Sequence, residues 1–151
     1  MTIWIEKALA LAIHDRQLAE HGGSAGVHAE DLLESALARP QQLYAYGDPS
    51  PDLADLAATL AFGLARNHPF VDGNKRTAAV VCETFINLND GLLNAEDSEL
   101  FPRYLALADG TLPLEEFAAW LRGHIQITAK NQIQEPRTRR PAVKGKRVAR
   151  G

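Results

Sequence analysis

The sequence predicts an all-α protein: a compact bundle of six helices, with a short flap between the second and third helices and a disordered basic tail at the C-terminus. Apolar residues recur at the three- and four-residue spacing of a helix through most of residues 1–127. Glycine and proline interrupt this pattern at intervals. From Thr128 the pattern stops, and polar residues, two prolines and clustered Arg and Lys follow. We therefore expect one domain over residues 1–127 and a tail over residues 128–151.

The first two helices are bounded by a capping residue, a glycine pair and a proline. Thr2 is the expected N-cap of the first helix, which should end at Gly22-Gly23. The second helix is expected over about residues 28–38, because Pro40 follows and residues before a proline disfavour the α conformation. Residues 41–51 have the only strand-like character in the chain, and we expect them to form the exposed flap.

The same signals bound the remaining helices. Asp52 or Ser50 can cap the third helix, and that helix should end near Asn67 because His68 precedes Pro69. The last three helices are expected over about residues 74–88, 98–108 and 113–126.

Composition excludes several classes of protein. Apolar residues make up 46% of the chain, enough for a core, yet no run approaches the roughly 18 apolar residues of a membrane span. Charged residues at Glu6 and Lys7 interrupt the N-terminal apolar stretch, so we expect no signal peptide. The single cysteine, Cys82, allows neither a disulfide framework nor a cysteine metal site. A reducing cytoplasm fits this usage best.

Charge is distributed unevenly. Residues 1–125 carry eight Lys or Arg against 18 Asp or Glu, whereas residues 126–151 carry eight against one. Within the acidic body, Arg66, Lys75 and Arg76 lie inside eleven consecutive residues, and such a local spot suits a small polyanion better than a nucleic acid. The basic tail has three interpretations: a solvated extension, which we favour, a weak salt-sensitive contact with RNA or ribosomes, or an attachment to the acidic body.

The segment that carries chemistry is the ten-residue run HPFVDGNKRT, residues 68–77. It joins two predicted helices, and the second helix begins at a glycine followed by Asn, Lys and Arg. A helix N-terminus offers unpaired N–H groups and a positive dipole end, so it binds anions, and Gly73 lets a ligand approach the backbone. Asp72 supplies a hard oxygen ligand of the kind Mg²⁺ prefers. The imidazole of His68 can accept a proton from an attacking hydroxyl.

These parts are the ones that phosphoryl transfer requires, because catalysis there consists mostly of positioning and charge stabilisation. The competing interpretation is structural: Asp72 caps a helix, Gly73 makes a turn and His68 is an ordinary surface side chain. That interpretation suffices for any one residue taken alone. Six such residues within nine positions favour the functional interpretation.

The run resembles the signature of the Fic/Doc family and, within it, the Doc (death-on-curing) toxin branch. The resemblance extends to the first helix with His14-Asp15, to the turn formed by residues 20–23, and to the order of six helices, covering roughly residues 5–125. It implies that His68 is the general base acting on a Ser or Thr hydroxyl of a target protein. It also implies that Asp72 holds Mg²⁺ and that Phe70 anchors the loop.

The resemblance further implies an ATP-binding site and a docking surface. The residues implied to bind nucleotide phosphates are Arg66, Gly73, Asn74, Lys75 and Arg76. The flap is implied to dock the target segment, with Tyr44 and Tyr46 as weak candidates for that contact. Self-inhibited Fic proteins carry an inhibitory helix motif, from which residues 2–7 depart because they end in lysine. Inhibition by an antitoxin in trans is therefore expected.

Two departures from the broader Fic pattern bear on the chemistry. Fic adenylyltransferases typically have glycine where this chain has Lys75, and arginine where it has Ala79. Doc-type proteins share the lysine and are similar to kinases, so the resemblance implies transfer of the ATP γ-phosphate to a translation elongation factor of the Tu type, with arrest of translation. AMP transfer is the alternative, and a binding module without enzymatic activity is a third.

Overall fold

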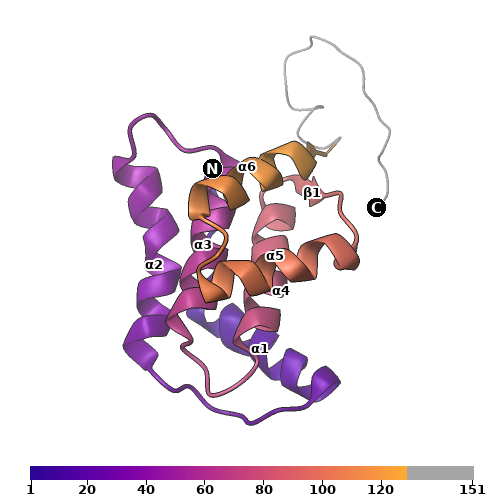
Figure 1. The fold of residues 1–151 in the computed structure, drawn as a ribbon. Helices are drawn as coiled ribbons and strands as arrows, with labels where there is room; N and C mark the ends of the chain where they lie inside the picture. The colour runs from indigo at the N-terminus through magenta and orange to yellow at the C-terminus, as the bar shows by residue number, and fades with distance from the viewer. Residues whose placement is uncertain (129–151) are drawn as a thin grey trace.

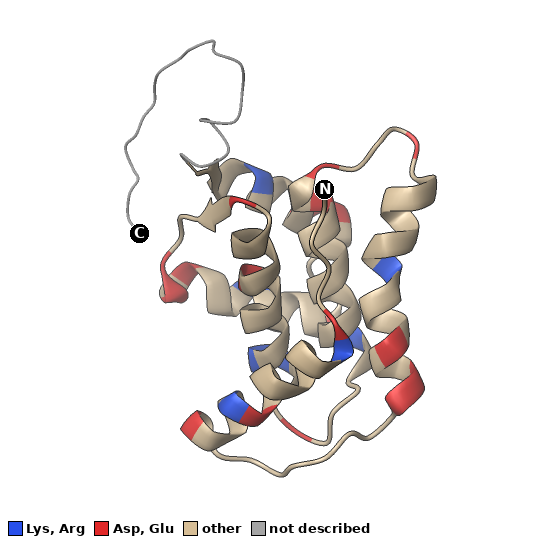
Figure 2. Ribbon diagram, turned by 180° about the vertical axis from the view of Figure 1, so that it is seen from behind, with Lys and Arg blue, Asp and Glu red and all other residues tan. Residues whose placement is uncertain are grey.

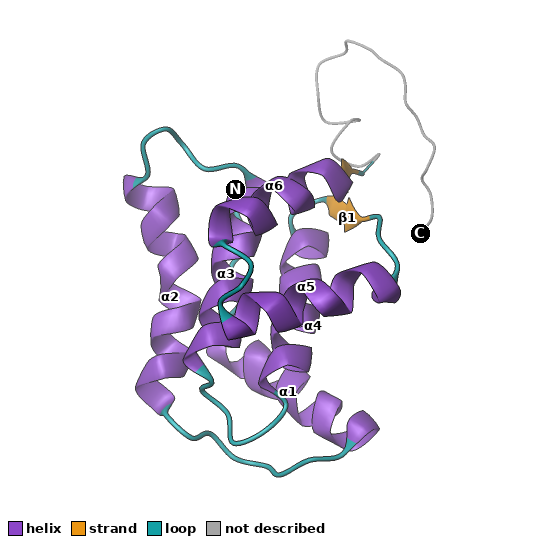
Figure 3. Cartoon of the chain, viewed as in Figure 1, coloured by secondary structure: helices purple, strands orange, loops and turns teal. Residues whose placement is uncertain are grey.

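The computed structural model describes residues 1–128, and these form an α-helical bundle with one small sheet (Figures 1 and 3). The all-α prediction is therefore confirmed. The predicted basic tail lies outside the described residues, apart from Thr128. The elements in chain order are α1 Lys7–His21, α2 Glu30–Tyr46, α3 Leu53–Asn67, α4 Asn74–Leu88, β1 Gly91–Leu93, α5 Asp97–Asp109, α6 Leu114–His124 and β2 Ile125–Ile127.

The core is built around α3, which is apolar on nearly every side and has most of its residues buried. Helices α2, α4, α5 and α6 pack around it. The backbone of α2 approaches α3 closely at Gly63, where an added Cβ atom would lie 3.1 Å from that of Ala36. Asp52 caps α3 through a reciprocal capping box with Asp55, as one of the two predicted caps.

Two further observations concern charge and helix hydropathy. Acidic positions are spread over the helices and loops of the body rather than gathered on one face (Figure 2). No helix within residues 1–128 is both long and apolar enough to cross a membrane.

The N-terminus differs from the prediction, because α1 begins at Lys7 with Glu6 as its N-cap, not at Thr2. The preceding residues belong to no helix or strand and are tied to the end of α4. The backbone N–H of Ile3 donates to Oδ1 of Asn89 at 2.7 Å, and Nδ2 of Asn89 donates to the Ile3 carbonyl at 2.9 Å. These long-range bonds compete with helix formation, and no local pattern signals them.

The second helix is longer than predicted, because it continues through Pro40 to Tyr46. A proline inside a helix removes one hydrogen bond and costs about 3 kcal/mol. Pro40 is fully buried, and Leu43 packs against the core one turn later, so apolar burial offsets that cost. Residues 41–46 are thus helical, and the flap shortens to residues 47–52.

A short antiparallel pairing of β1 with β2 was not predicted. Gly91 pairs with Ile127 and Leu93 with Ile125, which fastens the end of α6 to the end of α4. An added Cβ atom at Gly91 would lie 2.9 Å from a methyl group of Ile86. Strands of three residues are too short to show alternation, so the sequence carries no signal for them.

Candidate active site

The loop between α3 and α4 adopts left-handed backbone conformations at both of its ends. His68 is the C-cap of α3, with φ 50° and ψ 57°, and Gly73 is the N-cap of α4, with φ 78°. The glycine adopts this conformation without steric cost, whereas for the histidine it is uncommon. The two reversals fold residues 68–73 into a short bend that exposes the N-terminus of α4.

Phe70 and His14 anchor the bend to the interior of the protein. Phe70 is 2% exposed, and the His14 ring stacks on it with centroids 3.8 Å apart and planes 8° apart. The Nε2 atom of His14 lies 2.8 Å from the Asp72 carbonyl oxygen. A carbonyl only accepts hydrogen bonds, so Nε2 carries the proton. His14 is 2% exposed, and its position in the sequence gives no indication of this contact with the loop.

The side chain of Asn74, the first residue of α4, also holds the bend in place. Its Nδ2 donates to the Phe70 carbonyl at 2.9 Å, and its Oδ1 accepts from the Phe70 N–H at 2.9 Å. Both ends of the amide are thus engaged by one residue of the loop. The group that Asn74 can offer an anion is therefore its backbone N–H, in the first turn of α4.

A second chain segment, residues 22–29, runs beside the loop, as Figures 1 and 3 show. Val27 and Phe70 form an isolated antiparallel bridge, and the Val71 N–H donates to the Gly26 carbonyl at 3.1 Å. The Ser24 N–H donates to Oδ2 of Asp72 at 3.2 Å. At Gly23, where φ is +122°, an added Cβ atom would lie 2.8 Å from that oxygen. In the sequence, the glycines of this segment indicate a helix stop at Gly22-Gly23 but not a contact with Asp72.

The N-terminus of α4 opens into a cavity of about 440 Å³ between α1, α4 and α5. No side chain caps this helix, and its first turn contains no acidic residue. Asp72, Gly73, Lys75 and Arg76 all line the cavity. One carboxylate oxygen of Asp72 accepts the Gly73 N–H at 2.9 Å, while the side chain remains exposed. Uncapped amides, two cations and a carboxylate therefore line one space, where the amides and the cations suit an anion and Asp72 is the one carboxylate beside them.

Other predicted site residues lie outside this cavity. His68 is exposed at the α3 end of the loop and does not line it. The Arg66 guanidinium lies over the Phe62 ring, with its carbon 5.7 Å from the centroid, and approaches Gly110. Tyr44 and Tyr46 are on the last turn of the 17-residue α2, at the end opposite to residues 22–29 (Figure 1). The structure therefore does not bring these two tyrosines together with the loop.

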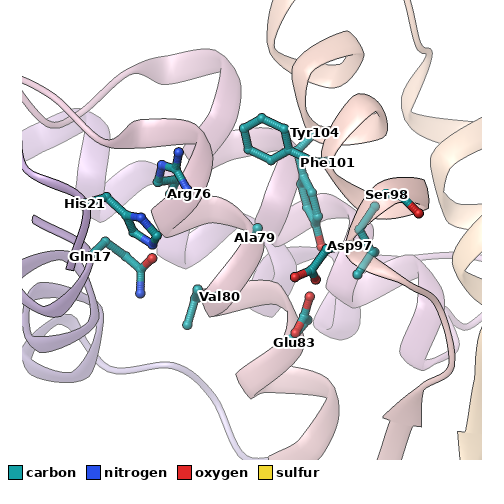
Figure 4. A pocket seen from close by; sticks show the side chains of 11 residues that line it. Gln17, His21, Arg76, Ala79, Val80, Glu83, Asp97, Ser98, Phe101 and Tyr104 are labelled. Carbon is teal, nitrogen blue, oxygen red and sulfur yellow. The ribbon is translucent and has the colours of Figure 1, made fainter.

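A second cavity of about 540 Å³ adjoins the first along α4 and α5 (Figure 4). Ala79 lines this second cavity, whereas Lys75 lines the first. Burial raises the pKa of Glu83, and the nearby negative charge of Asp97 raises it further. Four residues line both cavities, and these are Gln17, His21, Arg76 and Phe101.

Comparison with known proteins identifies a family and two relatives that match large parts of the chain. The Fic/DOC family profile matches residues 4–86. A protein of Mycolicibacterium smegmatis named Toxin Doc is 47% identical over 75 residues, which is 50% of this chain and 58% of that protein. A protein of Escherichia phage P1 named Protein kinase doc is 31% identical over 112 residues, which is 74% of this chain and 87% of that protein. The match thus spans less than two thirds of the first relative and most of the second.

Proposed function

The chain belongs to the Fic/DOC family, and from this premise we propose that it transfers the γ-phosphoryl group of ATP to a Ser or Thr hydroxyl of a protein. One observation carries the proposal: Asp72, Lys75, Arg76 and the uncapped N-terminus of α4 meet in one cavity. Phosphoryl transfer depends on positioning and on charge stabilisation, and this cavity supplies groups for both.

The residues present fit a nucleotide phosphate and a magnesium ion. The free N–H groups of the first turn of α4 point toward an incoming anion, and Arg76 adds a fork of donors matched to phosphate oxygens. Asp72 is exposed and keeps acceptor capacity beyond its two backbone bonds, so it would hold Mg²⁺, which neutralises phosphate charge when bound. His14, Phe70 and Asn74 keep the loop rigid.

His68 is the base in this proposal. The target hydroxyl oxygen forms a bond to the γ-phosphorus while the bond from that phosphorus to the bridging oxygen breaks. ADP leaves with the electron pair, and the hydroxyl proton passes to the imidazole. Exposure of His68 at the corner of the loop supports access by a protein substrate, because the side chain is not enclosed.

Two features favour phosphate over AMP transfer. Lys75 is half-buried in the first cavity, where its side chain takes up space and supplies charge beside the α4 N-terminus. Ala79 offers no hydrogen-bond donor to a phosphate chain, and it lines the second cavity. A relative named as a protein kinase supports the same choice.

We further propose that the chain is the toxin of a toxin–antitoxin pair, held inactive by a separate antitoxin, and that its target is an elongation factor of the Tu type. A relative named as a toxin supports the first part. The antitoxin segment would fold on binding, a mode that suits a groove between helices.

The test is transfer of label from ATP to a purified Tu-type elongation factor in the presence of Mg²⁺. We expect label from γ-labelled ATP and none from α-labelled ATP. His68→Ala and Asp72→Asn should each abolish transfer, while Asp31→Asn, at an exposed position on α2, should not. Label from α-labelled ATP would refute the kinase assignment, and full activity of both loop variants would refute the site.

A further inference from the structure

Two arginines from neighbouring helices share one aromatic ring near the C-terminal end of α3. The guanidinium carbons of Arg39 on α2 and Arg66 on α3 each lie 5.7 Å from the centroid of the Phe62 ring. The ring is half-buried against the core, whereas both arginines are exposed. Helices α2 and α3 pack side by side here (Figure 1). We refer to these three residues as the arginine surface.

The arginine surface carries more positive charge than the neighbouring side chains neutralise. Within residues 1–128, neither guanidinium forms a hydrogen bond or an ion pair. The carboxylate of Asp109, at the end of α5, interacts electrostatically with Arg66, but its Oδ1 accepts hydrogen bonds from Thr111 instead. The two guanidinium carbons are at most twice 5.7 Å apart, because both lie that far from one centroid. A further carboxylate brought to this surface is therefore attracted by both cations.

The arginine surface is separate from the cavity at the α4 N-terminus and lies along α3 from His68. Neither arginine lines that cavity. Phe62 is six residues before His68, which corresponds to about 9 Å along a helix. An extended peptide advances about 3.3 Å per residue. A substrate whose acceptor hydroxyl lies at His68 can therefore bring a side chain about three residues away to the arginine surface.

We propose that the arginine surface binds an acidic side chain of the protein substrate, about three residues from the phosphorylated Ser or Thr. This inference rests on the proposed function, because it places the acceptor hydroxyl at His68. A carboxylate matches the fork of donors that a guanidinium presents, and it is attracted by both charges. A nucleic acid fits less well, since residues 1–125 carry eight Lys or Arg against 18 Asp or Glu and repel a long polyanion.

The first test measures binding without catalysis, by ¹H–¹⁵N NMR of the full chain with ATP, Mg²⁺ and end-blocked synthetic peptides. The peptide Glu-Gly-Gly-Thr-Gly-Gly-Glu has a carboxylate three residues from threonine on both sides, and Gln-Gly-Gly-Thr-Gly-Gly-Gln is its neutral match. We expect the acidic peptide to bind about fivefold more tightly and to shift the side-chain Nε–H signals of Arg39 and Arg66. Arg103, stacked on Trp120 at 4.3 Å, is the matched control and should not respond. Equal binding of the two peptides, or no shift at Arg39 and Arg66, would overturn the inference.

The second test measures the KM for a purified Tu-type elongation factor at saturating ATP. Arg39→Gln and Arg66→Gln should each raise this KM about fivefold, Arg39→Lys should recover most of the loss because it keeps the charge, and Arg103→Gln should leave the KM unchanged. A role confined to covering Phe62 would lower stability without this selective effect of charge. An unchanged KM for the protein in both glutamine variants, or a raised KM for ATP in its place, would overturn the inference and leave the proposed function standing. Absence of label transfer by the wild-type protein would overturn both.

Discussion

Replacing His14 with phenylalanine tests whether the buried imidazole holds the loop in place. Phenylalanine retains a ring that can stack on Phe70 but cannot donate to the Asp72 carbonyl, which His14 does at 2.8 Å. Loss of one hydrogen bond that leaves a part-buried carbonyl unpaired costs about 1–3 kcal/mol. His14→Ala also removes the stacked ring pair, worth about 0.5–1.5 kcal/mol more. Alanine should therefore be the more destabilising change.

The free energy of unfolding from urea denaturation measures both effects, and His28→Phe is the matched control because that side chain is exposed. Phosphotransfer measured on the same proteins should fall more than stability alone accounts for, since a shift of about 1 Å in Asp72 can cost on the order of a hundredfold in rate. Equal stability of His14→Phe and His28→Phe would refute the reasoning, as would wild-type activity of His14→Ala.

Two further predictions test the surroundings of the loop and the join between α3 and α6. Gly23→Ala should reduce phosphotransfer at least tenfold more than Gly22→Ala. A Cβ atom at Gly23 would lie 2.8 Å from Asp72 Oδ2, whereas one at Gly22 meets nothing within 4 Å. Equal losses of activity in the two variants would contradict this prediction. The hydrogen bond from Arg122 holds the pKa of Asp52 well below its usual range. The stabilisation of the folded protein by this ion pair is therefore fully present above about pH 4 and is lost as the pH falls through the lowered pKa of Asp52. Because the Asp52 side chain is 49% exposed, Asp52→Asn should lower the free energy of unfolding by at most about 1 kcal/mol at pH 7, and a gap that persists unchanged to pH 2 in urea titrations would refute this account.

Local signals predicted the parts of the fold that depend on neighbouring residues. The cap at Asp52, the end of α3 at Asn67 and the start of α4 at Asn74 are all observed as expected. Each is set by a side chain or glycine within a few positions of the boundary, so the sequence contains the cause. The loop residues were identified for the same reason, because Asp72 and Gly73 lie directly before the helix that they expose.

Long-range contacts explain what the sequence did not reveal. The extension of α2 past Pro40 depends on burial against the core, and the pairing of β1 with β2 depends on residues more than 30 positions apart. Likewise, His14 lies 58 residues from the carbonyl that it contacts. The sequence also gives no indication that the side-chain amide of Asn74 is bonded at both ends to the backbone of Phe70.

The central claim is that a nucleotide phosphate lies at the N-terminus of α4. Two-dimensional ¹⁵N NMR of the full chain during titration with ATP and Mg²⁺ tests it directly, because amide signals report the environment of each N–H group. The account predicts that the amides of Asn74, Lys75 and Arg76 shift most, and that Asp72→Asn weakens the response. Shifts confined to another surface, such as the region around Arg66, or no shift at saturating nucleotide, would contradict it.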